Sequence, residues 1–242
     1  LADWIREVYH LNVVSLTPAK RGFFGETWRL KTDKKGYFVK LDAFEQHQRI
    51  YARSFKVVDW LCSKGIDFVN TIVKTADGRL FTEFDGAVLG IFDWIDGENI
   101  ETDGTKILEY QMLARIYALP LDGIEIAKED FSASSAEDFF GQWETLKDPE
   151  VLALLEENRS TLVYRAKRLR FFARLCQADS CDFYITHGDA GGNFLIGADH
   201  PYLVDWEEVL LAPPERDAWV MGFRPWARVL FQKALHQNGI AY

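Results

Sequence analysis

Short apolar runs separated by turn-forming residues dominate the first 95 positions, and this pattern predicts β-strands. The predicted strands lie in the ranges 13–16, 21–30 (two strands around a turn), 37–41, 69–75, 79–84 and 86–95. Two stretches with apolar residues at helical spacing interrupt them, a short one over 3–10 and a longer one over 44–63. Gly65 follows the longer stretch and suits the C-terminal cap of a helix.

Beyond residue 97 the apolar positions recur mostly at helical spacing. They predict helices over 105–118, 134–146 and 150–176, with Asp148-Pro149 at the start of the last one and a further helix beginning at Glu215. Strands that come first and helices that follow indicate an α+β fold.

One hairpin stands among these helices and carries the candidate chemistry. The apolar runs Phe194–Ile196 and Tyr202–Val204 flank a short turn, with Asp189 and Asn193 before the first run and Asp205 after the second. Because a hairpin brings its outer ends together, we expect these three side chains to converge. Two carboxylates and an amide suit Mg²⁺, which proteins usually hold through one or two carboxylates plus substrate phosphates.

Composition narrows the class of protein. The 242 residues allow one large domain or two small ones. There are 37 acidic and 28 basic residues, a formal net charge of −9, which argues against nonspecific binding of nucleic acid. A basic predicted helix, 150–176, is open to a nucleic-acid interpretation, but a solvated helix face fits a net-acidic chain better.

The cysteines and the length of the apolar runs bear on location. Cys62, Cys176 and Cys181 form an odd, unpatterned set, which favours free thiols in a reducing compartment over a zinc site. The apolar runs fall short of the ~18–20 residues that span a bilayer. We therefore expect a cytoplasmic protein without a membrane partner; the sequence does not give its oligomeric state.

His187-Gly188-Asp189 with Asn193, followed by Val204-Asp205-Trp206, resembles the catalytic loop and metal-binding aspartate of the aminoglycoside phosphotransferase and choline kinase family, which are small-molecule relatives of protein kinases. The run 211–217 is similar to the spectinomycin-phosphotransferase-like branch of that family. The resemblance implies a two-lobe protein-kinase-like fold. Residues 1–94 would form a mostly β nucleotide-binding lobe and residues 95–242 a mostly helical catalytic and substrate lobe, with ATP in the cleft.

The resemblance also assigns roles to the hairpin residues. Asp189 would be the catalytic base that faces the substrate hydroxyl, and Asn193 and Asp205 would be the Mg²⁺ ligands. Asn193 follows Asp189 by four residues where the family usually has five, and Gly191-Gly192 could supply the backbone freedom to compensate. His187 and Asp217 would support the catalytic loop structurally.

In the N-terminal part, Gly22 and Gly25 lie in the turn of residues 21–30, where glycines let backbone N–H groups approach phosphate; a bare turn is the alternative. Lys40 resembles the lysine that pairs with the α- and β-phosphates, although a lysine in a strand can also simply face solvent. The family expects a helical glutamate to orient this lysine, and Glu45 is the only glutamate in the following helix. A solvated charge at the start of that helix explains Glu45 equally well.

The run from Asp93 through Trp94 to Ile95 resembles the hinge whose backbone groups hydrogen-bond adenine, while a plain buried strand is the alternative. The function implied is an ATP- and Mg²⁺-dependent phosphotransferase that acts on a hydroxyl of a small molecule. An aminoglycoside or aminocyclitol acceptor would suit two acidic groups, for which ordinary surface charge is the other explanation: Asp93, Asp96, Glu98, Glu101 and Asp103, or Glu207 and Glu208. A noncatalytic nucleotide-binding protein (pseudokinase) and a metal-dependent hydrolase are the alternatives.

Overall fold

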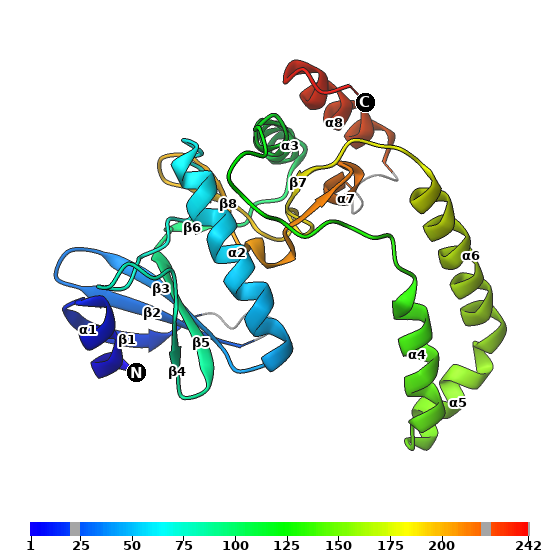
Figure 1. Cartoon of the computed structure of the whole chain (residues 1–242), viewed down its shortest axis with the longest axis horizontal. Helices are drawn as coiled ribbons and strands as arrows, with labels where there is room; N and C mark the ends of the chain where they lie inside the picture. The colour runs from blue at the N-terminus through cyan, green and yellow to red at the C-terminus, as the bar shows by residue number, and fades with distance from the viewer. Residues whose placement is uncertain (20–24, 219–223, 242) are drawn as a thin grey trace. The chain divides into compact units, whose positions relative to one another are not determined.

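The computed structural model describes residues 1–19, 25–218 and 224–241 (Figure 1). These residues form two compact units. The larger comprises Leu1–Ala127 and Phe183–Tyr242, and the smaller is Lys128–Asp182. In the part of the chain that is described, none of the helices is both long enough and apolar enough to cross a membrane.

An antiparallel five-stranded sheet forms the N-terminal part of the larger unit, with strands in the order β1-β2-β3-β5-β4. The strands are β1 (Val13–Pro18), β2 (Glu26–Thr32), β3 (Gly36–Asp42), β5 (Ala87–Asp93) and β4 (Thr82–Phe84). Helix α1 (Ala2–Tyr9) places Ile5 and Tyr9 in a buried cluster with residues of the sheet such as Leu30, Val39 and Leu89. The buried apolar residues of these strands therefore build one part of the core.

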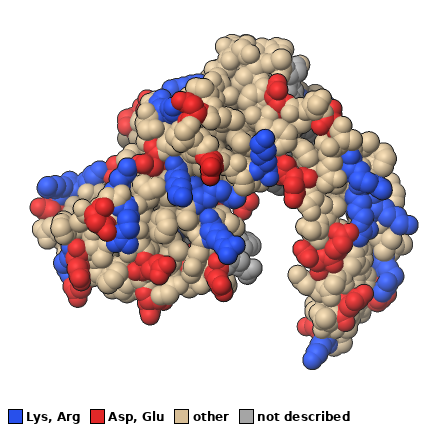
Figure 2. Space-filling model, in the orientation of Figure 1, with Lys and Arg blue, Asp and Glu red and all other residues tan. Residues whose placement is uncertain are grey.

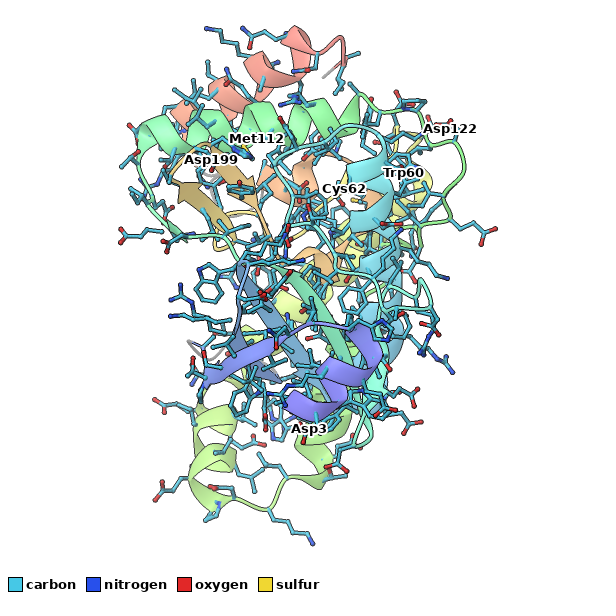
Figure 3. The ribbon with its side chains drawn as sticks, turned by 90° about the vertical axis from the view of Figure 1, so that its left-hand side faces the viewer. Asp3, Trp60, Cys62, Met112, Asp122 and Asp199 are labelled. Carbon is cyan, nitrogen blue, oxygen red and sulfur yellow. The ribbon has the colours of Figure 1, made fainter. Side chains whose placement is uncertain are left out.

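Helix α2 (Glu45–Ser63) agrees with the predicted helix over 44–63 and packs closely on the sheet. A Cβ atom at Gly90 of β5 would lie 2.5 Å from the ring of Phe55, so the absence of a side chain at Gly90 allows this approach. The C-terminal end of α2 is bonded to the loop after the next helix, since Trp60 Nε1 donates to the Asp122 carbonyl at 3.1 Å (both residues are labelled in Figure 3). Lys64 Nζ also bonds the Asp122 carboxylate at 3.1 Å.

The predicted strand over 69–75 is wrong. That segment makes two isolated bridges to different partners, Val69 with Leu203 and Ile72 with Phe92, because it passes from the hairpin to the sheet instead of following one neighbour. The predicted strand over 79–84 is likewise shorter, since only Thr82–Phe84 pairs with β5. The apolar positions in these segments therefore predicted which side chains are buried. They did not predict how far each segment pairs with a neighbouring strand.

The rest of the larger unit combines short strands with two long helices, α3 (Asp103–Tyr117) and α8 (Pro225–Gln237). These helices pack together, with the rings of Tyr110 and Phe231 5.0 Å apart. The predicted hairpin is present as β8 (Phe194–Gly197) and β9 (Pro201–Leu203). The other short elements are β6 (Gly97–Glu98), β7 (Tyr184–Thr186), the 3₁₀ helix η1 (Trp206–Glu208), β10 (Leu210–Ala212) and α7 (Glu215–Ala218).

The smaller unit consists of α4 (Ser134–Thr145), α5 (Pro149–Glu157) and α6 (Arg159–Ala178). The single helix predicted over 150–176 is therefore wrong: it is two helices that meet at Asn158, whose φ of −99° and ψ of 5° interrupt the helical path. The Asp148 carboxylate caps α5 as expected, accepting from the backbone of Glu150 and Val151. Figure 2 shows both basic and acidic side chains on the visible face of this unit, and Arg170 pairs with Glu137 at 2.7 Å.

Candidate active site

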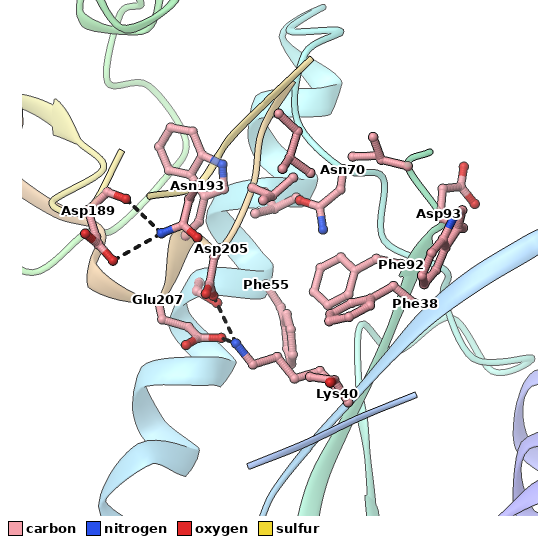
Figure 4. Close-up of a pocket in the computed structure, with 18 of the residues that line it drawn as sticks. Phe38, Lys40, Phe55, Asn70, Phe92, Asp93, Asp189, Asn193, Asp205 and Glu207 are labelled. Atoms are coloured by element: carbon pink, nitrogen blue, oxygen red, sulfur yellow. Dashed lines mark hydrogen bonds and ion pairs between the residues drawn. The ribbon is translucent and has the colours of Figure 1, made fainter. Parts of the chain in front are cut away.

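A cavity of about 520 Å³ lies within the larger unit, between the sheet, α2 and the β8–β9 hairpin. Seven of the eight site residues predicted from the sequence line it, namely Lys40, Asp93, Trp94, Ile95, Asp189, Asn193 and Asp205. Figure 4 labels all of these except Trp94 and Ile95. Residues far apart in the chain therefore meet at one cavity.

Gly25, the eighth predicted site residue, is not among the described residues that line this cavity. It has a φ of 69°, and a Cβ atom there would clash with the carbonyl oxygen of Leu41 on the neighbouring strand. A glycine is thus required at the start of β2 for close strand approach. Gly22 of the same predicted turn lies outside the described residues.

The hairpin brings its outer ends together. Val204 N donates to the Asn193 carbonyl at 3.0 Å. Asn193 Nδ2 donates to the Asp189 carbonyl at 2.8 Å and to Asp189 Oδ2 at 3.1 Å. The four-residue spacing between Asp189 and Asn193 thus still lets the two side chains touch, and it leaves Asn193 Oδ1 as a possible oxygen ligand.

Asp205 adopts a left-handed backbone conformation, with φ of 65° and ψ of 64°, directly before η1. Such a conformation is uncommon for a residue with a side chain, although aspartate and asparagine tolerate it best. Partial burial opposes ionisation of Asp205, but the positive charge of Lys40 holds its pKa below the ordinary value. The carboxylate is therefore available as an anion for a cation.

The amine of Lys40 lies between two carboxylates. Its Nζ is 2.9 Å from Asp205 Oδ1 and also bonds Glu207, while the side chain is only 11% exposed. Burial alone would lower the pKa of Lys40, but the two carboxylates outweigh burial and raise it. Burial raises the pKa of Glu207 to about 7, although Lys40 opposes this shift.

Glu45, the expected partner of Lys40, is the first residue of α2 and is exposed. Glu207 on η1 bonds Lys40 instead. The sequence alone suggests Glu207 for a cationic acceptor and not for this bond. Its position two residues after Asp205 was the available signal for a shared contact, but only the fold brings η1 to Lys40.

A buried network supports the loop that carries Asp189. The Asp217 carboxylate accepts from Tyr117 Oη at 2.7 Å, from His187 N at 3.0 Å and from Gly188 N at 2.5 Å. These bonds agree with the supporting role expected for Asp217. Gly188 has a φ of 89° and lies against the guanidinium of Arg216, so a side chain would not fit there.

The fully buried ring of His187 bridges the loop and the hairpin. Its Nε2 lies 2.8 Å from the Val204 carbonyl, and Asp189 N donates to its Nδ1 at 3.3 Å. Burial lowers the pKa of His187, so the neutral tautomer with hydrogen on Nε2 satisfies both bonds. This ring therefore holds the backbone of Asp189, which agrees with the structural role expected for His187.

The predicted hinge forms another wall of the cavity. Asp93 N donates to the Thr71 carbonyl at 2.9 Å, and Trp94 N donates to the Gly36 carbonyl at 3.2 Å. The Asp93 carboxylate bonds Lys35 at 2.5 Å. Phe38 and Phe92 add aromatic faces beside this backbone, a combination suited to a flat heterocycle.

The donors at the hairpin fit Mg²⁺ chemically. Across the described ranges, no group of three or more His, Cys, Asp and Glu side chains is placed to hold a metal ion. Asp205 and the Asn193 amide provide hard oxygen ligands, and Mg²⁺ typically takes one or two carboxylates and completes its coordination with phosphates and water.

Comparisons with known proteins give a family. A family model described as the phosphotransferase enzyme family matches residues 15–242. A search of curated proteins finds no match. A solved structure of spectinomycin phosphotransferase in complex with ADP and spectinomycin has a TM-score of 0.77 at 19% identity, over 97% of this chain and 78% of that one.

Two further solved structures have the same fold. Choline kinase from Streptococcus pneumoniae has a TM-score of 0.59 at 18% identity, over 96% of this chain and 78% of its own. Amicoumacin kinase in complex with AMP-PNP, Ca²⁺ and Ami has a TM-score of 0.66 at 13% identity, over 98% of this chain and 76% of its own.

Together these findings confirm the resemblance noted in the sequence, the kinase-like α+β fold and the expected enzyme class, a phosphotransferase with an alcohol group as acceptor. The match to the family model covers nearly the whole chain. The chain belongs to the phosphotransferase enzyme family.

Proposed function

We propose that this protein binds Mg²⁺·ATP in the cavity and transfers the γ-phosphate to a hydroxyl of a small molecule. The observation that carries this proposal is the convergence of Lys40, Asp189, Asn193 and Asp205 on one cavity with an aromatic wall. Residues 1–94 would supply the nucleotide-binding lobe and residues 95–242 the catalytic and substrate lobe.

The nucleotide would lie with its base between the hinge and the aromatic residues Phe38 and Phe92. Its phosphates would extend toward Lys40, whose amine is already held in place by Asp205 and Glu207. Asp205 and Asn193 would hold Mg²⁺, which neutralises charge on the phosphates during transfer.

Asp189 would act as the base toward the acceptor hydroxyl. Asn193 Nδ2 donates a hydrogen bond to Oδ2 of this carboxylate, and this bond fixes the Asp189 side chain. The other oxygen, Oδ1, would accept the proton of the hydroxyl as the phosphate bond forms. His187 and Asp217 hold the loop so that this carboxylate faces the cavity.

We further propose a cationic acceptor such as an aminoglycoside or aminocyclitol. Asn99 Nδ2 donates to the carbonyls of Gly192 and Phe194, both at 2.9 Å, so the acidic stretch around Asn99 runs beside the catalytic loop. Glu98 and Glu101 in this stretch are exposed. Their charges would attract amino groups of an acceptor close to Asp189.

The test is ADP release in a coupled assay with Mg²⁺·ATP and a panel of aminoglycosides, aminocyclitols, choline and other hydroxyl compounds. Asp189→Ala should lower kcat by about 10²–10⁴-fold, the usual contribution of a general base, while ATP binding is retained. Asp199→Ala, which removes an exposed carboxylate at the turn of the same hairpin, is the matched control and should leave turnover unchanged.

The outcomes separate the alternatives. Nucleotide binding without turnover of any acceptor would indicate a pseudokinase, and phosphate release without an acceptor would indicate a hydrolase. Loss of both turnover and ATP binding in Asp189→Ala would show that Asp189 is structural, contrary to the proposed role.

A further inference from the structure

Asn70 lies beside the hinge and on its cavity face. The bridge between Ile72 and Phe92 is antiparallel, and Asp93 N donates to the Thr71 carbonyl at 2.9 Å. Counting outward from these contacts places Asn70 opposite Trp94. Side chains directly opposite each other in an antiparallel pair share a face, and Phe92 and Asn70 both line the cavity (Figure 4).

The carboxamide of Asn70 has unused hydrogen-bonding capacity. Its Oδ1 is buried and has no hydrogen-bond partner among the described residues, and Figure 4 shows the amide nitrogen directed into the cavity. Ser54, which lines the same cavity, instead donates its hydroxyl to the Tyr51 carbonyl at 3.2 Å. A buried acceptor without a partner is costly and rare, so a ligand toward which the carboxamide turns this oxygen would bind more tightly.

We infer that Asn70 reads the base of the bound nucleotide and selects adenine. The inference rests on the proposed nucleotide site. The hinge backbone at Asp93–Ile95 and the Asn70 side chain reach the cavity from adjacent segments, so they can address two neighbouring edges of one planar base. The hinge would take the edge that carries N1, and Asn70 the edge that carries N7.

The chemistry of that edge favours adenine. Adenine offers a 6-amino donor next to the N7 acceptor, and a carboxamide matches this pair with its oxygen and its nitrogen. Guanine offers two acceptors, O6 and N7, so the carboxamide could donate to only one of them and its oxygen would face the other. Phe38 and Phe92 would contact the faces of the base without distinguishing the two purines.

The experiment combines deletions of single groups in the nucleotide with a change at Asn70, and titration calorimetry measures Kd in Mg²⁺. The probes are ATP, 7-deaza-ATP, which lacks the N7 acceptor, purine riboside triphosphate, which lacks the 6-amino group, and GTP. In the unmodified protein each deleted group should weaken binding about 3–10-fold, the range of one net hydrogen bond, and GTP should bind more weakly still.

Asn70→Leu keeps the approximate size and removes both polar atoms. It should weaken ATP binding about tenfold or more and abolish the discrimination between ATP and 7-deaza-ATP. The matched control is Val58→Ala, which removes apolar contact from the same cavity. It should weaken ATP and 7-deaza-ATP equally, so that the N7 preference survives. The measurements on the unmodified protein stand whether or not either variant folds.

Equal affinity of the unmodified protein for ATP, 7-deaza-ATP and purine riboside triphosphate would overturn the role of Asn70 and leave the proposed nucleotide site standing. An N7 preference that persists in folded Asn70→Leu would also overturn it. Failure to bind any of the four nucleotides would overturn both the inference and the proposed function.

Discussion

At the scale of single residues, the arrangement of the site depends on which charged side chains contact each other. Lys40 bonds Asp205 and Glu207, while the exposed Glu45 at the start of α2 takes no part in these bonds. The amine is therefore oriented from the hairpin side of the cavity. Because Asp205 is also a proposed metal ligand, the lysine and the metal would be positioned by the same short segment.

Lys40→Met tests the phosphate contact. Loss of a charge-assisted hydrogen bond to phosphate should raise the Kd for Mg²⁺·ATP about 10–100-fold. Lys74→Met is the control, because Lys74 is an exposed lysine paired with Asp59 at 2.9 Å and should leave the Kd unchanged. Equal affinities in the two variants would contradict the role of Lys40; calorimetric titration measures both.

The His187 ring gives a prediction in pH. Burial lowers its pKa in the folded state, so an unfolded chain takes up the proton first as the pH falls below the ordinary value of about 6.5. Above about pH 6.5, His187 is neutral in both states and should not affect the free energy of unfolding. Below that pH, the folded state should lose stability until the pH reaches the lowered pKa of the folded protein. Imidazole ¹⁵N NMR should show the neutral Nε2–H form at pH 6.5, and a half-protonated ring at that pH would contradict the prediction.

At the scale of elements, α3 carries a charged pair in the interior. Lys106 Nζ lies 2.7 Å from Glu109 Oε2, and the two side chains are 4% and 3% exposed. A Cβ atom at Gly191 would lie 3.5 Å from Lys106 Nζ, so the pair lies directly beside the loop that carries Asp189. Burial raises the pKa of Glu109, while Lys106 opposes that shift.

Breaking this pair should destabilise the larger unit strongly. Glu109→Ala leaves the Lys106 charge buried without a partner and should lower the free energy of unfolding by about 3–5 kcal/mol. The double variant Lys106→Met with Glu109→Leu removes both charges and should recover most of that loss. Urea denaturation measures the effect, and a double variant no more stable than Glu109→Ala would refute this account.

At the scale of the whole molecule, the cavity and all the proposed site residues belong to the larger unit, although that unit is made of two stretches of chain separated by Lys128–Asp182. The sheet, in the first stretch, contributes Lys40 and the hinge. The β8–β9 hairpin, in the second stretch, contributes Asp205. Ligand binding should therefore be coupled to the folding of both stretches at once.

Thermal unfolding tests this coupling. At a concentration a hundred times its Kd, Mg²⁺·ATP should stabilise the folded state by about 2.7 kcal/mol, which corresponds to a rise in Tm of roughly 5–10 °C. Asp205→Asn keeps a residue type that tolerates the left-handed backbone but removes the charge, and it should lose the part of this shift that requires Mg²⁺. An unchanged difference between Mg²⁺ and EDTA would count against Asp205 as a ligand.

The sequence alone predicted features that depend on local pattern. The N-terminal strands, the helix α2 and the β8–β9 hairpin follow from apolar runs, helical spacing and turn residues, and the hairpin was enough to bring Asp189, Asn193 and Asp205 together. The segment 69–75 is an exception. Its apolar positions are spaced as in a strand because they are buried, but the segment does not pair continuously with one neighbour.

Only the tertiary structure decided which distant residues touch. Lys40 and Glu207 are 167 positions apart, and nothing in the spacing of either residue indicates their bond. In the sequence Asn70 is an ordinary polar residue, and only the structure shows that its segment lies against the hinge. The physical reason is that apolar periodicity records which side chains are buried, whereas the partner of a buried charge or amide is fixed by how separate elements pack together.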